Sequence, residues 1–479
     1  MPNQPNFLLI FPDQWRGDCV GGPYDHPVVE TPFLDQMANE GVTFTSAYSA
    51  CPSCIATRAV LATGQTPDEV GRIGYRDGVP WHYENTMYHR LRDSGYQTIN
   101  VGKTHFYPQR LHLGFEENQV YDCIRIDEGF DSDYHIWLKD KGEGLVRDTA
   151  MEVTSNSWMA MPWVHPEPLH PSTWTAQTAI DMLHRRDATR PFFLQVGFHR
   201  PHPPLDPPIE YFRRYEGREM PPVPVGDWAE EFGQPVKRVD SSTGTLPEHI
   251  LNRSRWAYYA QITHLDYQIG RILDCVRVIG ELENTWVIFI ADHGELLGDH
   301  NHFRKVVPFE GSAKVPFIVR PPRSFEGSRG VWRAEVTSHF DVMPTVLEQA
   351  GLQVTDDIHG QSLEPLLGAS ALDEDADWRE FMHGEHSGFA DQGNQFLTDG
   401  REKFVWLTES GRELLFNLEE DPQELHDRSA DPEYAERVAL WRSRLARILA
   451  ERGDDALSDG ERLIPGTNLP AVREWLLEE

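Results

Sequence analysis

The stretch Phe7-Leu8-Leu9-Ile10-Phe11-Pro12-Asp13-Gln14 sets five apolar residues almost directly before a carboxylate and an amide. A short apolar run bounded by polar residues is typical of a buried strand in a parallel sheet. Four more runs have this character, namely Thr98–Val101, Phe192–Val196, Val287–Ile290 and Pro316–Val319. Amphipathic segments alternate with these runs, so the sequence predicts an α/β fold: a large, mostly parallel sheet sandwiched by helices.

The predicted helices carry apolar residues at mixed spacings of three and four. They are Pro32–Asn39, Thr57–Thr63, Thr86–Ser94, Thr175–His184 and Arg253–Val278. Two segments lack such a pattern. Phe106–Pro171 is interpreted as an insertion on the substrate side, and the Pro- and Gly-rich stretch Leu205–His249 as a long loop over one face.

An acidic, apolar-poor stretch at Ala369–Trp378 predicts a domain boundary. We therefore expect a catalytic α/β domain over residues 1–370 and a C-terminal subdomain over 371–479. Three strand-like pieces and one helix follow the boundary, at Gln395–Leu397, Lys403–Leu407, Glu413–Phe416 and Pro432–Arg452. They predict a small antiparallel sheet with a packed helix.

Composition excludes several classes of protein. The chain has 44 Lys+Arg against 76 Asp+Glu in 479 residues, a net charge of −32, which disfavours nucleic-acid binding. No apolar run approaches the ~18–20 residues that span a bilayer, so no membrane partner is expected. As given, the chain reads as cytoplasmic, or as periplasmic or secreted if a signal was trimmed. Its five scattered cysteines argue against a disulfide framework, and Cys19 and Cys51 are interpreted as packing residues.

Polar residues follow four of the predicted strands. The strand endings lead into Asp13-Gln14, Gly102-Lys103-Thr104-His105, His199-Arg200-Pro201-His202 and Asp292-His293. In an open parallel sheet, ligands bind beyond the carboxyl ends of the strands. We therefore expect these four endings to converge on one cleft.

Asp13, Gln14, Asp292 and His293 would offer mainly oxygen ligands and one imidazole. That set suits a hard divalent cation such as Ca²⁺ or Mg²⁺. The alternative is that each Asp merely caps a following helix. Two such pairs at equivalent strand ends favour the metal site.

The segment Pro52-Ser53-Cys54-Ile55-Ala56-Thr57-Arg58-Ala59-Val60-Leu61-Ala62-Thr63-Gly64 is the most specific on the chain. Cys54 falls just before a predicted helix that Gly64 can end, so the helix dipole would favour a thiolate or a bound anion there. Arg58, one turn into the helix, could hold the same anion. A small residue before a helix can also serve packing alone.

The segment resembles the signature of the type I sulfatases, in the alkaline phosphatase superfamily, whose core is Cys-x-Pro/Ala-x-Arg followed by an apolar run and Thr-Gly. The order of the other motifs agrees: the Asp-containing start, Gly-Lys-x-His, His-x-Pro-His-x-Pro, Asp-His-Gly-Glu and a following Lys. Residues 416–424, Phe-Asn-Leu-Glu-Glu-Asp-Pro-Gln-Glu, are similar to the family's C-terminal signature. The resemblance extends from Asn6 to about Leu425.

This resemblance implies a modified cysteine. In the family the cysteine is oxidised to formylglycine, and the hydrated aldehyde supplies the nucleophilic oxygen. Carried onto this chain, Cys54 becomes both nucleophile and metal ligand. The remaining ligands would be Asp13, Gln14, Asp292 and His293, holding one Ca²⁺, Mg²⁺ or Mn²⁺ per subunit. A formylglycine-generating maturase is then an expected partner, and a homo-oligomer is a further expectation.

The resemblance also implies roles for cationic groups. Arg58, Lys103 and Lys305 would stabilise the negative charge of the sulfate transition state. His105 resembles the group that holds the hydrate and later takes its proton. His202 resembles the residue at the leaving oxygen and, with Lys305, is a candidate general acid. Each lysine could instead be an ordinary surface residue, and His199 is interpreted as an orienting or packing residue rather than a catalyst.

Three functions remain open. The first is hydrolysis of small sulfate monoesters, aryl, alkyl or at a saccharide end, because an acidic surface repels polyanions. The second is phosphonate monoester or phosphodiester hydrolysis, because Asp13-Gln14 resembles that branch where sulfatases usually have a second Asp. The third is a silent anion-binding protein that keeps Cys54 as a thiol. Ala56 in place of Pro fits recognition by radical maturases rather than by the oxygen-dependent one.

Overall fold

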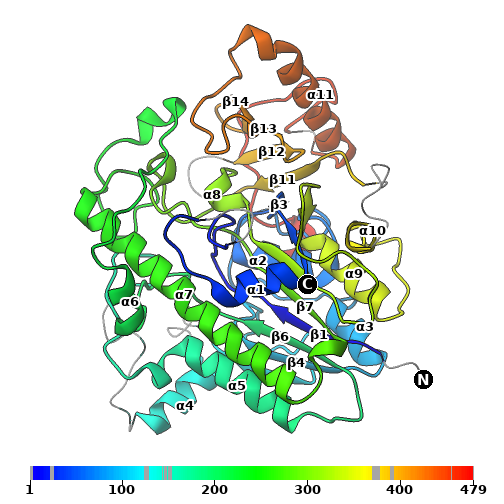
Figure 1. The fold of residues 1–479 in the computed structure, drawn as a ribbon. Helices are drawn as coiled ribbons and strands as arrows, with labels where there is room; N and C mark the ends of the chain where they lie inside the picture. Colours follow the sequence, from blue (N-terminus) through cyan, green and yellow to red (C-terminus); the bar gives the residue numbers. More distant parts are fainter. Residues whose placement is uncertain are drawn as a thin grey trace.

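The computed structural model describes residues 4–21, 26–122, 129–142, 144, 148, 154–368, 378–388, 393–454 and 456–477. An eight-stranded sheet with order β5-β4-β6-β1-β7-β8-β2-β9 forms its centre (Figure 1). The strands are β1 (Asn6–Ile10), β2 (Val42–Phe44), β4 (Gln97–Gly102), β5 (Glu117–Val120), β6 (Phe192–Gly197), β7 (Thr285–Ile290), β8 (Phe317–Arg320) and β9 (Val331–Arg333). Short β3 (Ala47–Tyr48) and β10 (Thr337–Ser338) pair beside it. The predicted mostly parallel sheet is confirmed.

One strand runs against the others. β8, predicted as a parallel strand over Pro316–Val319, pairs antiparallel with both β7 and β2. After β7 the chain forms loops and the four-residue helix α8 (Glu310–Ala313), and then re-enters the sheet from the same edge. A parallel return needs a crossover to the opposite edge, and this connection makes none, so the strand direction reverses.

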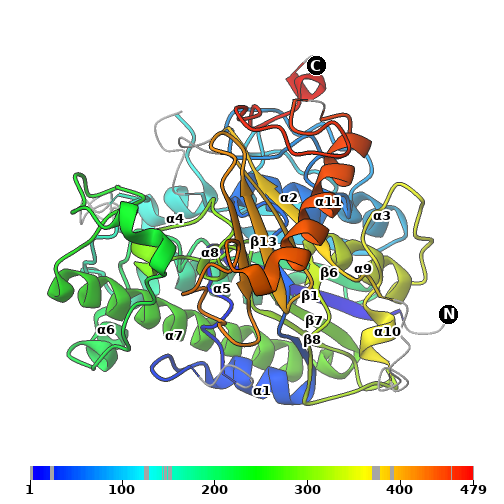
Figure 2. The ribbon, with the colours of Figure 1, turned by 90° about the horizontal axis from the view of Figure 1, so that it is seen from above.

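Helices cover both faces of the sheet (Figures 1 and 2). On one face lie α1 (Pro32–Glu40), α5 (Pro171–Arg185) and α7 (Glu248–Val278). On the other lie α2 (Cys54–Thr63), α3 (Met87–Asp93) and α9 (Val342–Gln349). All five predicted helices are present. Three begin earlier than predicted, α5 because Pro171 occupies the first turn, where its missing N–H is harmless.

The two irregular segments contain more structure than expected. Helix α6 (Ile209–Tyr215) and a short 3₁₀ turn at Asp227–Phe232 lie within the predicted loop 205–249. Helix α6 forms because Phe212 and Tyr215 become buried against α7. The predicted insertion 106–171 contains β5 and α4 (Asp133–Lys141).

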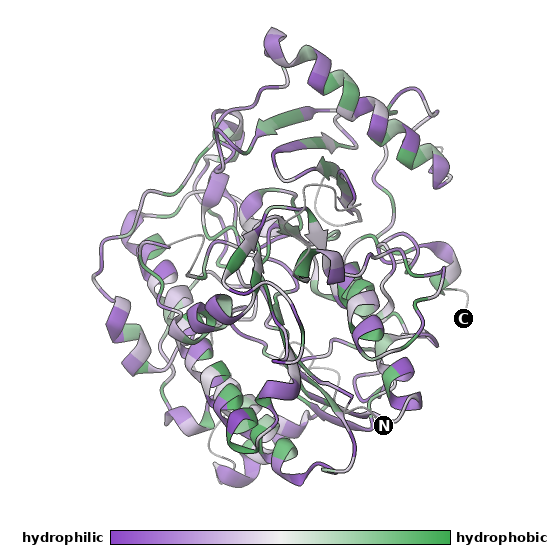
Figure 3. Cartoon of the chain, turned by 45° about the vertical axis from the view of Figure 1, so that its right-hand side comes forward, coloured by the Kyte–Doolittle hydropathy of each residue, from purple (hydrophilic) through white to green (hydrophobic). Residues whose placement is uncertain are grey.

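The C-terminal part is an antiparallel sheet of β11 (Met382–His386), β12 (Asn394–Thr398), β13 (Glu402–Leu407) and β14 (Glu413–Asn417), with α11 (Ala435–Glu451) packed on it. Figure 3 shows α11 banded by polar and apolar residues, and its apolar side buries Trp441, Leu445 and Leu449 on the sheet. The short helix α10 (Glu364–Leu367) precedes this part. Residues 369–377, where the boundary is predicted, lie outside the described residues, so the division at 370 stays a prediction.

Among the helices of the described residues, none has the length and apolar character needed to cross a bilayer.

A pair of valines tests the central sheet. Val287 in β7 is fully buried, whereas Val278 at the end of α7 is 74% exposed. Val287→Ala removes two buried methyl groups and is expected to lower the free energy of unfolding by about 2 kcal/mol, whereas Val278→Ala should change it by less than about 0.5 kcal/mol. Urea unfolding followed by tryptophan fluorescence measures both. Equal shifts would contradict the placement of β7 in the core.

Candidate active site

The four strand endings predicted to converge belong to four adjacent strands. The strands β4, β6, β1 and β7 are consecutive in the sheet, so their carboxyl ends meet at one edge. Backbone hydrogen bonds continue past the strands: Asp13 N donates to Phe198 O at 2.9 Å and Asp292 N to Pro12 O at 3.3 Å. The polar residues after the strands are thereby held side by side.

A cluster of metal-ligating groups forms at this edge. Ligand atoms of Asp13, Cys54, Asp292 and His293 all lie within 4.8 Å of one another, and all four residues are buried. The Sγ of Cys54 is 3.2 Å from His293 Nε2 and 3.8 Å from Asp13 Oδ1. The predicted convergence of residues 13 and 292 on Cys54 is confirmed as geometry; their roles as ligands remain predictions.

Helix α2 delivers Cys54 to the cluster. It begins at Cys54 itself, and all ten of its residues are buried. Its alanines at positions 56, 59 and 62 allow close packing. As predicted, Gly64 ends the helix in the left-handed conformation at φ 68°, and a Cβ there would lie 2.9 Å from Ile358.

The imidazole of His293 is oriented for ligation. Its Nδ1 donates to the carbonyl of Gly294 at 2.9 Å, which leaves Nε2 as the lone-pair atom. Nε2 lies 3.6 Å from a carboxylate oxygen of each of Asp13 and Asp292. Burial is the largest effect on the pKa of His293, which falls to about 4 despite the neighbouring carboxylates, so the ring is neutral at pH 7.

Arg58 and Lys103 balance the two buried carboxylates. Arg58 Nη2 lies 2.9 Å from Asp292 Oδ2 and 3.6 Å from Asp13 Oδ2, and its Nη1 donates to Lys103 O. Lys103 Nζ is 2.5 Å from Asp13 Oδ2. Burial is the largest single effect and opposes the charge on Lys103, but Asp13, Cys54 and Asp122 together raise the pKa of the ammonium. Burial likewise acts to raise the pKa of Asp13, yet Lys103 and its cationic neighbours bring it well below its usual value.

Gln14 lies between a lysine and a glutamate. Its Oε1 accepts from Lys305 Nζ at 2.6 Å, while its Nε2 donates to Glu295 Oε2. Its backbone N–H donates to Asp292 Oδ1 at 3.0 Å, so the residue borders the cluster. Lys305 is thus a residue of the site rather than an ordinary surface lysine.

The predicted histidines lie on the neighbouring loops. The backbone N–H of His202 donates to Asp13 O, and its Nδ1 to Pro203 O at 2.8 Å. Burial, and then the charge of Lys305, hold the pKa of His202 well below its usual value. His199 packs edge-on against His202, which agrees with an orienting role. His105, two residues after Lys103, is buried with its ring 6.2 Å from that of Tyr75.

Comparison with known proteins identifies the family. The model of the sulfatase family matches residues 5–352, and that of the N-sulphoglucosamine sulphohydrolase C-terminal region matches residues 298–451. The chain belongs to the sulfatase family. The predicted resemblance and the enzyme class, sulfuric ester hydrolase, are thereby confirmed.

Similar proteins cover nearly the whole chain. An arylsulfatase of Clostridium perfringens is 40% identical over 477 residues, covering 97% of this chain and 98% of its own. A choline-sulfatase of Rhizobium meliloti is 28% identical, covering 90% of this chain and 83% of its own. The crystal structure of a phosphonate monoester hydrolase of Agrobacterium radiobacter has a TM-score of 0.79 at 27% identity, covering 94% of this chain and 96% of its own.

One part of the prediction for Cys54 is wrong. The dipole of α2 is expected to favour a thiolate or a bound anion there. Instead, burial and then the charge of Asp13 raise the pKa of the thiol to about 12, against the opposing effect of Lys305 and Lys103. Among these protein groups the thiol is protonated at pH 7 and is a weak nucleophile.

The donor set of this sulfatase suits a divalent cation. Two carboxylates of like charge lie within 4.8 Å of each other beside a neutral imidazole whose lone pair is directed at them. Such an arrangement favours an oxygen-preferring cation, with His293 held by a carbonyl partner as metal-bound histidines usually are.

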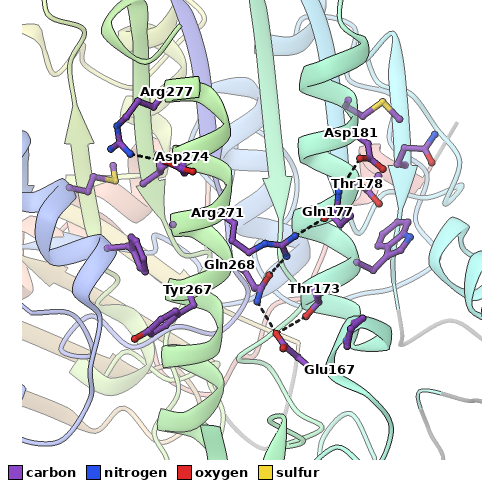
Figure 4. Close-up of a pocket in the computed structure, with 18 of the residues that line it drawn as sticks. Glu167, Thr173, Gln177, Thr178, Asp181, Tyr267, Gln268, Arg271, Asp274 and Arg277 are labelled. Atoms are coloured by element: carbon purple, nitrogen blue, oxygen red, sulfur yellow. Dashed lines mark hydrogen bonds and ion pairs between the residues drawn. The ribbon is translucent and has the colours of Figure 1, made fainter. Parts of the chain in front are cut away.

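A cavity of about 1050 Å³ lies away from this site. It runs along α5 and α7, on the face of the sheet that those two helices cover. Figure 4 shows that its polar side chains bond mainly to one another, with Arg271 between Gln268 and Gln177 and with Glu167 accepting from Gln268. No predicted site residue lines it.

The site residues predicted from the sequence omit Glu295, although this glutamate belongs to one of the motifs quoted there. Glu295 ends the Asp-His-Gly-Glu motif, and its carboxylate contacts Gln14 and two backbone amides, those of Leu297 and Arg304. The only feature of the sequence that could have indicated Glu295 as a site residue is its position in this motif. The packing interpretation of Cys19 and Cys51 agrees with the structure, in which both are buried and free.

Removal of one carboxylate tests the cluster. Asp13→Asn is expected to lower Ca²⁺ affinity by about 100-fold, because it removes one of two anionic donors and leaves Lys103 without its counter-charge. Calorimetric titration and metal content after dialysis measure the effect. Asp93→Asn, at an exposed carboxylate on α3, is the control. Unchanged affinity in the Asp13 variant would contradict a metal site here.

Proposed function

We propose that this sulfatase hydrolyses small sulfate monoesters, with aryl or alkyl alcohols or a saccharide end, using a formylglycine derived from Cys54 and one divalent cation. The observation that carries the proposal is the position of Cys54. Its Sγ lies 3.2 Å from His293 Nε2 and 3.8 Å from Asp13 Oδ1, in a cluster that also holds three cationic side chains, Arg58, Lys103 and Lys305.

The cation would be held by Asp13, Asp292 and His293, with the side chains at positions 14 and 54. Ca²⁺ is the first candidate because oxygen donors dominate the set, and Mg²⁺ or Mn²⁺ are the alternatives. When bound, the cation polarises the sulfate ester and the attacking oxygen. As a neutral amide, Gln14 would add an oxygen ligand without a further negative charge, and its Nε2 donates to Glu295 Oε2.

Conversion of Cys54 to formylglycine would replace a weak nucleophile by a stronger one. A buried thiol with a pKa of about 12 is a weak nucleophile at pH 7, whereas a formylglycine supplies a nucleophilic oxygen on the same Cβ. The proposal therefore includes a maturase as partner, of the radical type because Ala56 stands where Pro is commoner.

The reaction requires the S–O bond to the alcohol to break while the oxygen of water ends on sulfate. Negative charge grows on the nonbridging oxygens and on the departing oxygen, so fixed cations lower the barrier. Arg58 and Lys103 are held rigidly by Asp13 and Asp292 beside Cys54. They would stabilise the sulfuryl oxygens without moving during the reaction.

A proton must reach the departing alkoxide or phenoxide. His202 and Lys305 are the two candidates, and His105 would hold the nucleophilic oxygen and accept its proton. In the neutral ring of His202, Nδ1 is committed to Pro203 O, so Nε2 is an acceptor. Lys305 Nζ uses one of its N–H groups on Gln14 Oε1, which leaves further donors, so it is the preferred donor.

The acidic surface favours small substrates. A net charge of −32 repels densely sulfated polymers at long range. Similarity to an arylsulfatase and to a choline-sulfatase supports the same choice of small esters.

Phosphonate monoester or phosphodiester hydrolysis is the second candidate function. Gln14 follows Asp13 here, and the phosphonate monoester hydrolase of Agrobacterium radiobacter shares the fold at 27% identity. The 40% identity to an arylsulfatase favours the sulfate ester as the main substrate.

A panel of chromogenic esters tests the function. With matured enzyme, 4-nitrophenyl sulfate is expected to be turned over at least about 100-fold faster than the matching phenylphosphonate and phosphodiester, and Cys54→Ala should abolish all three activities. Mass spectrometry of the peptide that contains Cys54 should show the loss of sulfur that formylglycine requires. Dominance of the phosphorus esters would favour the second function, and an unmodified thiol in protein from the native host would favour a silent anion-binding protein.

Substrate size has its own test. At low salt, kcat/KM for a small aryl sulfate is expected to exceed that for a heavily sulfated oligosaccharide by at least about tenfold, because the protein field repels the polyanion. The gap should narrow as salt screens that field. A preference for the oligosaccharide at every ionic strength would overturn the small-substrate proposal.

A further inference from the structure

The loop that carries Lys305 has an unusual backbone. Arg304 and Val306, on either side of the lysine, have positive φ angles of 70° and 80°. Neither is a glycine, and a β-branched residue such as Val306 is a rare occupant of this conformation. Each such residue is disfavoured by steric contact, so the surrounding structure must hold the loop in place.

Several hydrogen bonds hold its backbone. The amide of Arg304 donates to Glu295 Oε1 at 2.5 Å, and the carbonyl of Arg304 accepts from Leu296 N at 2.8 Å. The amide of Val306 donates to Pro52 O at 3.2 Å, and Asn394 Nδ2, far along the chain, donates to the carbonyl of Val306 at 2.9 Å. Arg304 and Val306 are therefore held in place by three parts of the chain. Glu295 belongs to the Asp-His-Gly-Glu motif, Pro52 precedes Cys54, and Asn394 lies in the C-terminal sheet.

We propose that Asn394 is a positioning residue for Lys305, so that the C-terminal sheet takes part in the chemistry of the leaving group. This inference rests on the proposed function, in which Lys305 donates to the departing oxygen. Asn394 does not touch the reacting atoms; it acts by fixing the peptide next to the lysine.

The sheet is a rigid support for this contact. Asn394 is the first residue of β12, is 2% exposed, and pairs with His386 of β11 and Leu407 of β13. β11 in turn is tied to the catalytic part, because Glu385 N donates to Ala50 O at 2.8 Å, four residues before Cys54. The same support thus holds the segment before Cys54 and the loop that carries Lys305.

The geometry gives Asn394 a distinct effect on catalysis. One N–H of the Lys305 ammonium is used on Gln14 Oε1, and an ammonium has three. A displaced loop would carry the remaining donors away from the leaving oxygen. Esters whose alcohols are weak leaving groups depend on that donation, while nitrophenyl esters depend on it little.

The test compares Asn394→Leu, which keeps the branched arrangement of side-chain heavy atoms and removes the donor, with wild type over aryl sulfates of graded phenol pKa. We expect kcat for 4-nitrophenyl sulfate to fall less than about threefold and kcat for phenyl sulfate to fall at least about tenfold, with KM nearly unchanged. The dependence of log kcat on leaving-group pKa should become steeper.

Thr398→Val is the matched control. Thr398 lies on the same strand, is equally buried, and donates through Oγ1 to Glu402 O at 2.8 Å, away from the Lys305 loop. Its loss should weaken the sheet by a similar amount without changing the leaving-group dependence. If log kcat also depended more steeply on leaving-group pKa in Thr398→Val, the effect of Asn394 would be merely structural, and the proposal would be overturned.

Hydrogen–deuterium exchange provides a readout independent of activity. In Asn394→Leu the amides of Arg304 and Val306, in the peptide 303–307, should exchange faster than in wild type and in Thr398→Val. Unchanged exchange, or an unchanged leaving-group slope, overturns the proposal. If wild type hydrolyses only phosphorus esters, the proposed function fails, and the same graded series with aryl phosphonates then decides the role of Asn394 on its own.

Discussion

The burial of two carboxylates at one edge of the sheet is the constraint on which the rest of this structure depends. Asp13 and Asp292 are fully buried within a few ångströms of each other. An unpaired buried charge costs several kcal/mol, so the fold must bring cations to the same place. Arg58 comes from α2 and Lys103 from the end of β4, and each contacts a carboxylate directly. Helix α2 therefore has to dock where Cys54 meets the cluster.

A second buried charge cluster joins the C-terminal sheet to the catalytic loops. Lys403 Nζ on β13 lies 2.6 Å from Glu310 Oε1 and 2.9 Å from Glu424 Oε1. Glu424 also accepts from the backbone N–H of Glu310, at the start of α8. The C-terminal signature 416–424 thus ends in a residue that fixes this sheet onto the segment following Lys305. The loop that carries Lys305 is consequently held from both domains predicted by the sequence.

The errors of sequence reasoning have separate physical causes. β8 has the apolar composition of a parallel strand, but direction depends on the path of the connection, which composition does not encode. β11 was missed because Met-His-Gly-Glu-His lacks the alternation that marks a half-buried strand; its polar side chains are buried by contacts with other segments. The thiolate expected at Cys54 was wrong because burial and the charges of Asp13 and Asp292 raise the pKa of the thiol.

By itself, the sequence determined the central strands, the helices between them, and the presence of carboxylate, amide and imidazole donors after the strand ends. These are local features, because apolar periodicity and strand-end motifs depend only on residues that are close together in the sequence. Only the tertiary structure decided that Glu295, Pro52 and Asn394 meet around Lys305, and that Cys54 lies buried beside His293 and Asp13. Those outcomes depend on burial and on contacts between residues separated by tens to hundreds of positions, which no local pattern records.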